Sequence, residues 1–363
     1  MTHHEPSLAR QTAFDEAKAK AFAGQMLTAL NGAALALMAS IGHRTWLFDE
    51  MAAASPCTSV ELARRAKLAE RYVREWLGVM VAARVVTYDP VAGTYTLPRE
   101  HAAFLTREGS VKNLAATMQF PSVVSALEEE ILARFHDGEG MHYHHYGRFH
   151  EVMGEVSYQT TVMPLVGSIL PLVDGLTDRL EAGIDVADLG CGAGRALLLL
   201  AERFPRSRFS GIDLCEAAFA PAEAAAWSKG LRNLAFRSQD LSRGLDGEFD
   251  VLFAFDAIHD QADPQAVLRS AHKALRPGGV FLMVEFGASS RLENNLAHPI
   301  APFLYMMSTM HCTPVSLGQG GQGLGAMWGM ETATEMLERA GFANVTVTRL
   351  PHDPFNAYFV ARP

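Results

Sequence analysis

The chain has few cysteines and no excess of positive charge. Its 363 residues include four cysteines, at positions 57, 191, 215 and 312, and none of them belongs to a CxxC pair. This spacing gives no disulfide framework of the kind found in small secreted proteins, so we expect reduced thiols and a cytoplasmic location. The formal net charge of −9 gives no overall attraction to nucleic acid or to an anionic membrane.

Long hydrophobic runs are also lacking. The polar N-terminus has no apolar core of a signal peptide, and the most apolar stretch, Leu27 to Ile41, is interrupted by Asn31, Gly32 and Ser40. It falls short of a membrane span, so we expect a buried helix here and no membrane partner. Apolar residues make up 49% of the chain, which is enough to build the cores of two ordinary domains.

The N-terminal part has the element order of a winged helix. Residues 11–54 repeat apolar positions at helical spacing. The sequence Thr58-Ser-Val-Glu61 is a capping box, which predicts a helix over 59–66, and a second helix is expected over 69–83. Residues 85–97 hold two short β-rich pieces around a turn, as in a hairpin.

A winged helix suggests DNA binding, but the charges of its candidate recognition helix do not favour that function. Arginines at positions 71, 74 and 84 are offset by Glu70 and Glu75. The other face is an apolar stripe from Trp76 to Val81, which suits packing or dimerisation better than a DNA groove. We therefore expect a homodimerisation domain over 1–105 and no nucleic-acid partner, with DNA binding as the alternative.

From about residue 181 the pattern changes to alternating strands and helices. This alternation predicts a doubly wound, Rossmann-like α/β domain over 181–363, and a helical connector is expected over 106–180. The last two strands leave no room for a helix between them, so they are expected to be antiparallel. The predicted strands are 184–189, 208–213, 234–238, 249–255, 279–286, 344–349 and 356–361.

The segment VADLGCGAG, Val186 to Gly194, joins the first of these strands to a helix through a glycine-rich turn. Glycines let the backbone turn sharply and approach a ligand closely, so Gly190, Cys191, Gly192 and Gly194 are expected to bind a cofactor. By itself, such a turn also fits a dinucleotide pyrophosphate at the helix N-terminus.

Acidic residues at the strand ends distinguish between these ligands. Asp188 would repel a pyrophosphate but suits the ammonium group of a methionine moiety. Asp213 ends the next strand, where a carboxylate can accept both ribose hydroxyls, and Leu214 follows it. Asp240 ends the third strand, placed to accept an adenine amino group, and Leu241 comes next.

Together these residues resemble the class I S-adenosylmethionine (SAM)-dependent methyltransferases. The resemblance covers residues 180–363 and includes Leu275-Arg-Pro-Gly-Gly279 before the fifth strand. It implies SAM as the cofactor and methyl transfer as the reaction.

The fourth strand leads into the candidate catalytic residues. Phe255 and Asp256 end it and are expected at the reactive end of the cofactor, because ligands of doubly wound sheets lie beyond the carboxyl ends of the strands. Asp256 would contact the methionine amine or line the pocket. The pair His259-Asp260 resembles the His-Asp pair of small-molecule O-methyltransferases, in which the histidine is the general base. The same resemblance implies that Glu285 orients the histidine and that the winged helix dimerises. For Asp260 itself a cap or a structural role is favoured.

The chemistry requires such a histidine when the acceptor is a hydroxyl or a thiol. Methyl transfer from a sulfonium is an in-line displacement from an activated donor, so the enzyme mainly positions the acceptor. The acceptor must also lose its proton, which an imidazole can take near neutral pH. We therefore expect methyl transfer to a small molecule with His259 as base and no required metal. A SAM-binding regulator and an enzyme acting on a macromolecule are the alternatives.

The segment Met141 to Tyr146 is rich in histidine and tyrosine. Its three histidines, at positions 142, 144 and 145, suggest metal binding as one interpretation. We favour a lid over the cofactor, in which Tyr143 and Tyr146 cover the sulfonium through cation–π contact.

The long insert over 287–330 is expected to build the acceptor pocket. Its methionines and tryptophan predict an apolar acceptor site. His311 and Cys312 are not expected to form a nucleophilic pair, because adjacent residues on a helix rarely meet. The apolar candidates are Met306, Met307, Met310 and Trp328.

Overall fold

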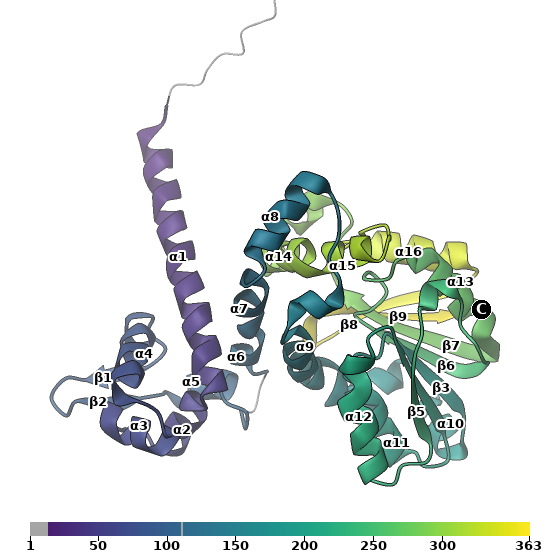
Figure 1. The fold of residues 1–363 in the computed structure, drawn as a ribbon, viewed down its shortest axis with the longest axis horizontal. Coiled ribbons are helices and arrows are strands. Elements are labelled where there is room, and N and C mark those ends of the chain that lie inside the picture. The colour runs from purple at the N-terminus through teal and green to yellow at the C-terminus, as the bar shows by residue number, and fades with distance from the viewer. Residues whose placement is uncertain (1–13, 110–111) are drawn as a thin grey trace, which may run out of the picture. The chain divides into compact units, whose positions relative to one another are not determined.

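The structure, a computed structural model, describes residues 14–109 and 112–363. The chain divides into two units, residues 1–110 and 111–363 (Figure 1). Most of the segment expected as a separate connector, 106–180, therefore belongs to the second unit, together with the α/β domain.

The first unit has the element order expected of a winged helix. Its third helix begins at the predicted capping box, because Thr58 Oγ1 accepts a hydrogen bond from Glu61 N and the Glu61 carboxylate accepts one from Thr58 N. The core includes an edge-to-face pair of Phe48 and Trp76. The elements are α1 (Glu16–Arg44), α2 (Leu47–Ala53), α3 (Ser59–Ala66), α4 (Glu70–Ala82), β1 (Thr87–Asp89), β2 (Thr94–Thr96) and α5 (Arg99–Leu105).

Helix α1 corrects one expectation. Its apolar stretch was expected to be buried, yet Phe22, Leu27 and Leu30 are 61–65% exposed. Burial begins near Ala39, close to the point where Trp76 donates a hydrogen bond to the Met38 carbonyl. The helix is also long and apolar enough to cross a membrane, judged by length and composition alone. Hydropathy predicted the helix but could not show what covers it.

The second unit is built around a seven-stranded sheet with the order β5-β4-β3-β6-β7-β9-β8. The strands from β5 to β7 are parallel, and β9 is antiparallel to both neighbours. The predicted strands and the predicted antiparallel pair are confirmed. The strands are β3 (Asp185–Leu189), β4 (Arg208–Asp213), β5 (Leu234–Ser238), β6 (Phe249–Phe255), β7 (Leu275–Phe286), β8 (Asn344–Leu350) and β9 (Asp353–Arg362).

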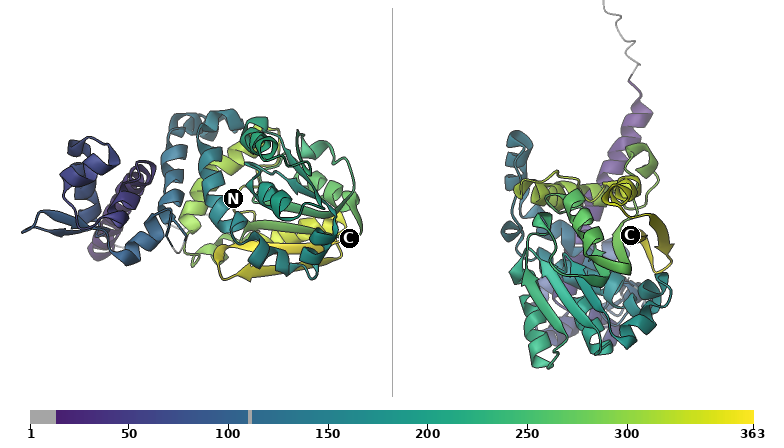
Figure 2. Two further views of the ribbon diagram at one scale, coloured as in Figure 1. Left: turned by 90° about the horizontal axis from the view of Figure 1, so that it is seen from below. Right: turned by 90° about the vertical axis from the view of Figure 1, so that its right-hand side faces the viewer.

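Helices cover both faces of this sheet (Figures 1 and 2). On one face α13 and α16 bury Leu268 and Leu337, and on the other α10 and α11 bury Leu180 and Leu200. Since both faces are covered, the central strand β6 and the second half of β7 are apolar almost throughout. The helices are α6 (Leu114–Thr117), α7 (Gln119–Ser125), α8 (Glu128–Asp137), α9 (Phe149–Ser157), α10 (Leu176–Ala182), α11 (Arg195–Arg203), α12 (Glu216–Ser228), α13 (Pro264–Ala274), α14 (Ala301–Met307), α15 (Thr313–Gly318) and α16 (Gly329–Ala340).

Shorter helical turns connect these elements. The 3₁₀ turns are η1 (Tyr143–Tyr146), η4 (Leu170–Leu172), η5 (Leu241–Arg243) and η6 (Leu292–Asn295), and the π-helical turns are η2 (Tyr158–Val162), η3 (Leu165–Ile169) and η7 (Ser308–Cys312).

The parallel register brings the ends of the central strands together. Asp188 in β3 lies opposite Gly211 in β4 and Phe253 in β6. The loops that follow these strands therefore emerge at the same edge of the sheet, where ligands of doubly wound folds bind. A separate apolar cluster joins helix α9 to the insert through residues such as Phe149 and Met307.

Candidate functional site

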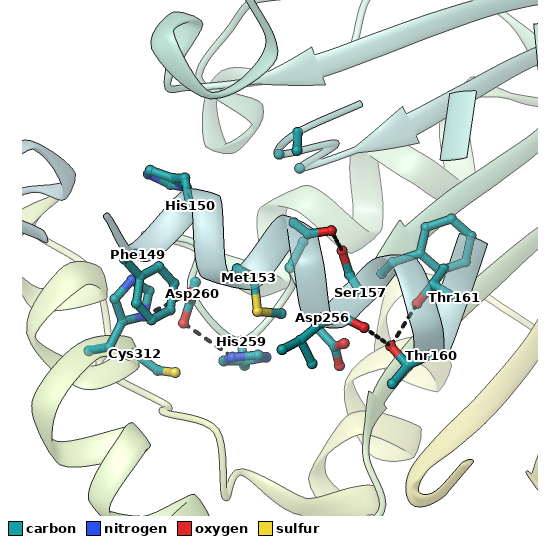
Figure 3. Close-up of a pocket in the computed structure, with 18 of the residues that line it drawn as sticks. Phe149, His150, Met153, Ser157, Thr160, Thr161, Asp256, His259, Asp260 and Cys312 are labelled. Atoms are coloured by element: carbon teal, nitrogen blue, oxygen red, sulfur yellow. Dashed lines mark hydrogen bonds and ion pairs between the residues drawn. The ribbon is translucent and has the colours of Figure 1, made fainter. Parts of the chain in front are cut away.

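A cavity of about 510 Å³ lies at the carboxyl ends of the strands. It is lined by the loops after β3, β4 and β6, by helix α9 and by part of the 287–330 insert. This volume is in the range of pockets that hold small molecules and cofactors. Figure 3 shows α9 running along the cavity past His259 and Asp256.

The glycine-rich loop forms the floor of this cavity beside helix α11. Gly190 and Gly192 both have positive φ angles, +74° and +49°, which residues with a Cβ rarely adopt. A Cβ on Gly190 would lie 2.5 Å from the Cβ of Ala257, so the two loops approach too closely for a side chain. Gly190, Cys191, Gly192 and Gly194 all line the cavity, as expected.

Two carboxylates in the cavity wall have buried oxygen atoms without a partner. Asp188 is 2% exposed, and neither its Oδ1 nor the Oδ1 of Asp256 accepts a hydrogen bond from the described residues. Burial, and then the charge of Asp213, raise the pKa of Asp188 to about 7. Burial also raises the pKa of Asp256, with Glu285 adding to it. A positively charged ligand would stabilise both carboxylates.

Asp213 connects the glycine loop to the end of β4. Its Oδ2 accepts a hydrogen bond from Gly192 N and its Oδ1 accepts one from Cys215 N, both at 2.8 Å. Burial raises its pKa, and these two backbone hydrogen bonds act against the rise. The expected neighbours Leu214, Leu241 and Phe255 also line the cavity.

His259 is buried and lines the same cavity, and Glu285 holds it in place. The His259 Nδ1 atom lies 2.5 Å from Glu285 Oε2. Glu285 reaches this position from the end of β7 and is itself fixed, because it accepts hydrogen bonds from Ile258 N and Trp328 Nε1. Burial alone would lower the pKa of His259, but the carboxylates of Glu285 and Asp260 raise it well above its usual range.

Asp260 does not cap a helix, which was one of the two roles, a cap or a structural role, favoured from the sequence. Helix α13 is capped by Asp263, whose Oδ1 accepts a hydrogen bond from Ala266 N. The Asp260 carboxylate lines the cavity instead, with Oδ1 3.2 Å from His259 Nε2 and Oδ2 3.8 Å from His311 Nδ1.

Helix α9 and the turn η7 supply residues that the sequence analysis did not select. Phe149, His150 and Met153 line the cavity from α9, and Cys312 lines it from η7 (Figure 3). His311, also in η7, lines it as well. The rings of Phe149 and His311 stack with centroids 3.6 Å apart. Neither His311 nitrogen has a hydrogen-bond partner among the described residues, and burial lowers its pKa well below the usual range. In the sequence, the one feature that could have indicated a site here was the mixture of histidine and aromatic residues around these positions.

Two expected cofactor residues lie outside the cavity lining. Tyr146 is buried and donates a hydrogen bond to the Met310 carbonyl, whereas Tyr143 lines the cavity. Asp240 caps the turn η5, since its Oδ1 accepts a hydrogen bond from Ser242 N. The cavity there is lined by its neighbours, glutamine 239 and leucine 241. In both cases a hydrogen bond within the protein engages the side chain that the sequence analysis had assigned to a ligand.

The insert contributes less of the pocket than its composition suggested. Of the four apolar candidates only Met307 lines the cavity. Met306 and Met310 pack against the apolar cluster of α7, α8 and α9, and Trp328 belongs to the core on the α13 face. Trp328 still contributes to the site, because its Nε1 donates a hydrogen bond to Glu285.

The histidines of residues 142–145 stack on one another. The rings of His144 and His145 have centroids 4.2 Å apart, and those of His142 and His144 are 5.8 Å apart. Within residues 14–109 and 112–363, the group of three ligand-type side chains that lies close enough to hold a cation is a different one, His259, Asp260 and Cys312.

Two family comparisons agree with this division of the chain. Residues 33–107 match a family described as an Rv2258c-like winged HTH domain. Residues 180–341 match a family described as a methyltransferase domain.

Individual proteins match over parts of the chain or in fold. A segment of 95 residues is 39% identical to trans-aconitate 2-methyltransferase of Deinococcus radiodurans and covers 26% of this chain. The chain spans only 35% of the length of that relative. The structure of human N-acetylserotonin methyltransferase in complex with SAM has a TM-score of 0.66 at 16% identity, covering 97% of this chain and 99% of that one. Mitomycin 7-O-methyltransferase has a TM-score of 0.68 at 15% identity, covering 96% and 100%.

Proposed function

We propose that the chain, whose residues 180–341 match a methyltransferase domain and whose residues 33–107 match a winged helix-turn-helix domain, uses SAM to methylate a hydroxyl or thiol of a small molecule. The observation that carries the proposal is the contact of His259 Nδ1 with Glu285 Oε2 at 2.5 Å, in the wall of a cavity that also contains the glycine loop.

The buried carboxylates support SAM as the cofactor. SAM carries an ammonium group and a sulfonium, and when bound it supplies a methyl group that is activated for displacement. Asp188 and Asp256 offer the unpartnered oxygens that suit these positive groups. Asp213 would bind the ribose, and the glycine loop leaves room for the ligand because a Cβ on Gly192 would meet nothing within 4 Å.

His259 is the residue placed to remove a proton from the acceptor. Glu285 accepts the Nδ1 hydrogen bond, which fixes the tautomer and leaves Nε2 as the nitrogen for proton transfer. Asp260 Oδ1 is 3.2 Å from Nε2 but accepts no hydrogen bond from the described residues, so the acceptor hydroxyl can compete for this position.

The charge of the cavity affects when His259 can act. The carboxylates of Glu285 and Asp260 raise its pKa, which favours the protonated ring that cannot serve as a base. The His259 pKa falls when another positive charge enters the cavity, because like charges disfavour the protonated form. We infer that the base becomes available after the cofactor has bound.

The shape of the site supports a small acceptor. The cavity has a volume of about 510 Å³ and is walled by α9 on one side, which suits an enclosed small molecule. The names of the two structural neighbours give N-acetylserotonin and the 7-oxygen of mitomycin as acceptors, both small molecules. A thiol or hydroxyl acceptor would use His259, whereas a neutral amine needs a base less.

We propose a dimerisation role for the first unit. In helix α4, Arg71 pairs with Glu75 and Arg74 pairs with Glu70, so these arginines are partly neutralised as DNA ligands. The exposed apolar side chains of α1 would be covered by a second copy of the chain.

The direct test is release of S-adenosylhomocysteine (SAH) from SAM, with pooled phenols, thiols and amines as acceptors. Turnover with the phenol or thiol pool, absent in His259→Ala, supports the proposal. Turnover with amines alone that survives in His259→Ala would contradict the role of the base. Tight SAM binding with no turnover in any pool would favour a regulator or a macromolecular acceptor, and DNA binding would be measured next.

A further inference from the structure

Linked polar side chains lie at the start of strand β9, in a part of the cavity wall that methyl transfer does not use. Asp353 begins this strand and is 1% exposed. Its Oδ1 accepts a hydrogen bond from Lys112 Nζ at 3.0 Å, and its Oδ2 accepts one from Asn356 Nδ2 at 2.7 Å and one from Tyr358 Oη at 3.1 Å. Lys112, Asp353 and Asn356 all line the cavity.

These contacts fix the orientation of the Asn356 amide. With an ammonium and two other donors against it, the Asp353 carboxylate accepts hydrogen bonds and donates none, so the amide nitrogen must face it and the amide oxygen is left free. Asn356 is 5% exposed, and its Oδ1 is buried with no hydrogen-bond partner in the part of the chain that the structure describes. A buried amide oxygen without a donor is costly. This atom therefore indicates a missing hydrogen-bond donor.

Strand pairing places Asn356 close to the proposed base. Asn356 lies opposite Phe286 in the antiparallel pair of β9 and β7, and side chains of directly opposite residues stand on the same face of a sheet. The ring centroids of Phe286 and His259 are 5.9 Å apart. Phe286 is thus a neighbour of both residues, and a molecule bound beside His259 can reach Asn356 across it.

The walls of this part of the cavity are aromatic and apolar. Phe286 packs with Phe303 and Leu304 in one apolar cluster, and all three line the cavity. Phe355, which precedes Asn356 in β9, lines it as well. Aromatic walls favour a flat apolar ring, and a polar atom among them fixes the orientation of that ring.

We propose that Asn356 is a specificity-determining residue, whose Oδ1 accepts a hydrogen bond from a second hydroxyl or N–H of the acceptor. The substrate class is then an aromatic ring with two donor groups, one methylated beside His259 and the other bound by Asn356. The assignment of the first group rests on the proposed function, whereas binding of the second does not require turnover. Asp353, paired with Lys112, is a positioning residue for the amide.

Calorimetry on the full-length protein with SAH bound tests this contact without turnover. The probes are the dihydroxybenzenes, each compared with the difluorobenzene of the same substitution, because fluorine has nearly the size of a hydroxyl but donates no hydrogen bond. Asn356→Leu should lower the affinity for the best-bound diol by roughly 10- to 100-fold and leave the affinities for the difluoro compound and for SAH within about twofold. Asn344→Leu, at the exposed start of β8, is the matched control.

A second variant keeps the test decisive if Asn356→Leu does not fold, as judged by circular dichroism. Asn356→Thr suits a strand, and its hydroxyl can still donate to Asp353 although the amide oxygen is gone. It should show the same selective loss for the diol. His259→Ala should lose turnover of the diol and retain the effect of Asn356→Leu on binding.

The outcomes separate this inference from the proposed function. An equal loss for the diol and the difluoro compound would mean a packing role only and overturns the inference. An unchanged affinity for the diol, or a wild-type protein that binds no diol, overturns it too. Methylation of phenols without a selective loss in Asn356→Leu contradicts this inference alone. A selective loss in a protein that methylates no acceptor contradicts the proposed function alone.

Discussion

The two ends of the cavity are built in different ways. We call the part formed by Asp188, the glycine loop and Asp213 the cofactor end, and the part formed by His259, Asp260, Phe149, His311 and Cys312 the acceptor end. The cofactor end comes from two adjacent strand ends and the loop between β3 and α11. The acceptor end takes its side chains from the loop after β6, from α9 and from η7, which are far apart in sequence. Local sequence can therefore specify the cofactor end but not the acceptor end.

The largest expected effect is a loss of turnover without a loss of SAH affinity when His259 is replaced. His259→Ala should lower turnover by about 10²- to 10⁴-fold, the usual contribution of a general base. The affinity for SAH should stay within about twofold, because the cofactor end is unchanged. Steady-state kinetics and calorimetry on one preparation measure both quantities, with His101→Ala in the first unit as the control. A loss of SAH affinity as large as the loss of turnover would show that the two ends are not separate.

The converse change acts on the cofactor end. Asp188→Asn removes the negative charge opposite the ammonium group of SAM, and a charged hydrogen bond contributes about 1.5–3 kcal/mol. The dissociation constant for SAM should rise by roughly 10- to 100-fold. Calorimetry measures this effect, and Asp178→Asn, on the exposed side of α10, is the matched control. Unchanged affinity in Asp188→Asn would remove this residue from the cofactor site.

The pH dependence of binding sharpens the same comparison. Burial raises the pKa of Asp188 to about 7, so the carboxyl becomes protonated as the pH falls through 7 and then loses its attraction for a cation. A bound cation favours the ionised form, and binding near pH 7 should release a proton. We expect the SAM affinity to fall by roughly tenfold from pH 8 to pH 6. The same dependence in Asp188→Asn would assign the titration to another group.

The smallest expected effect lies at the acceptor end. His311 has two unpartnered ring nitrogens, so one of them can bind a polar group of the acceptor. His311→Leu should raise the acceptor KM by about 2- to 10-fold, the value of one hydrogen bond, and leave the SAM affinity unchanged. Initial rates at varied acceptor concentration measure this change. A variant with unchanged KM for every acceptor would show that His311 has only a packing role against Phe149.

The sequence predicted the strand positions correctly, because the residues that form a strand also give it a recognisable local pattern. The strands over 208–213, 234–238 and 249–255 were located correctly because short strands alternate with helices along this half of the chain. The strand over 249–255 is also an apolar run, as expected of a covered parallel strand. The glycine loop and Asp188 could be placed at the cavity from the sequence, because both lie at the carboxyl end of a predicted strand. Glu285 was placed beside His259 by the resemblance to a family and not by spacing.

Some expected side chains lie outside the cavity lining, and each has a physical reason. Asp240 has the right position along the chain, but the backbone after β5 turns into η5 and the side chain caps it. Tyr146 was assigned to the cofactor by type, yet its hydroxyl donates to the Met310 carbonyl. Adjacent residues such as His311 and Cys312 need not contact each other to share a site, because each lies near Asp260. Contacts of this kind depend on the tertiary fold, which no local window contains.

Glu285 links the two ends, since it lies on the sheet that builds the cofactor end and holds the base of the acceptor end. The most direct test of this account is the methyl-transfer rate of Glu285→Gln at saturating SAM. The account predicts that kcat falls by at least roughly tenfold, because the ring of His259 loses the partner that fixes its tautomer, while the acceptor KM changes little. A variant with the wild-type kcat would contradict the central claim that the sheet positions His259 as the base.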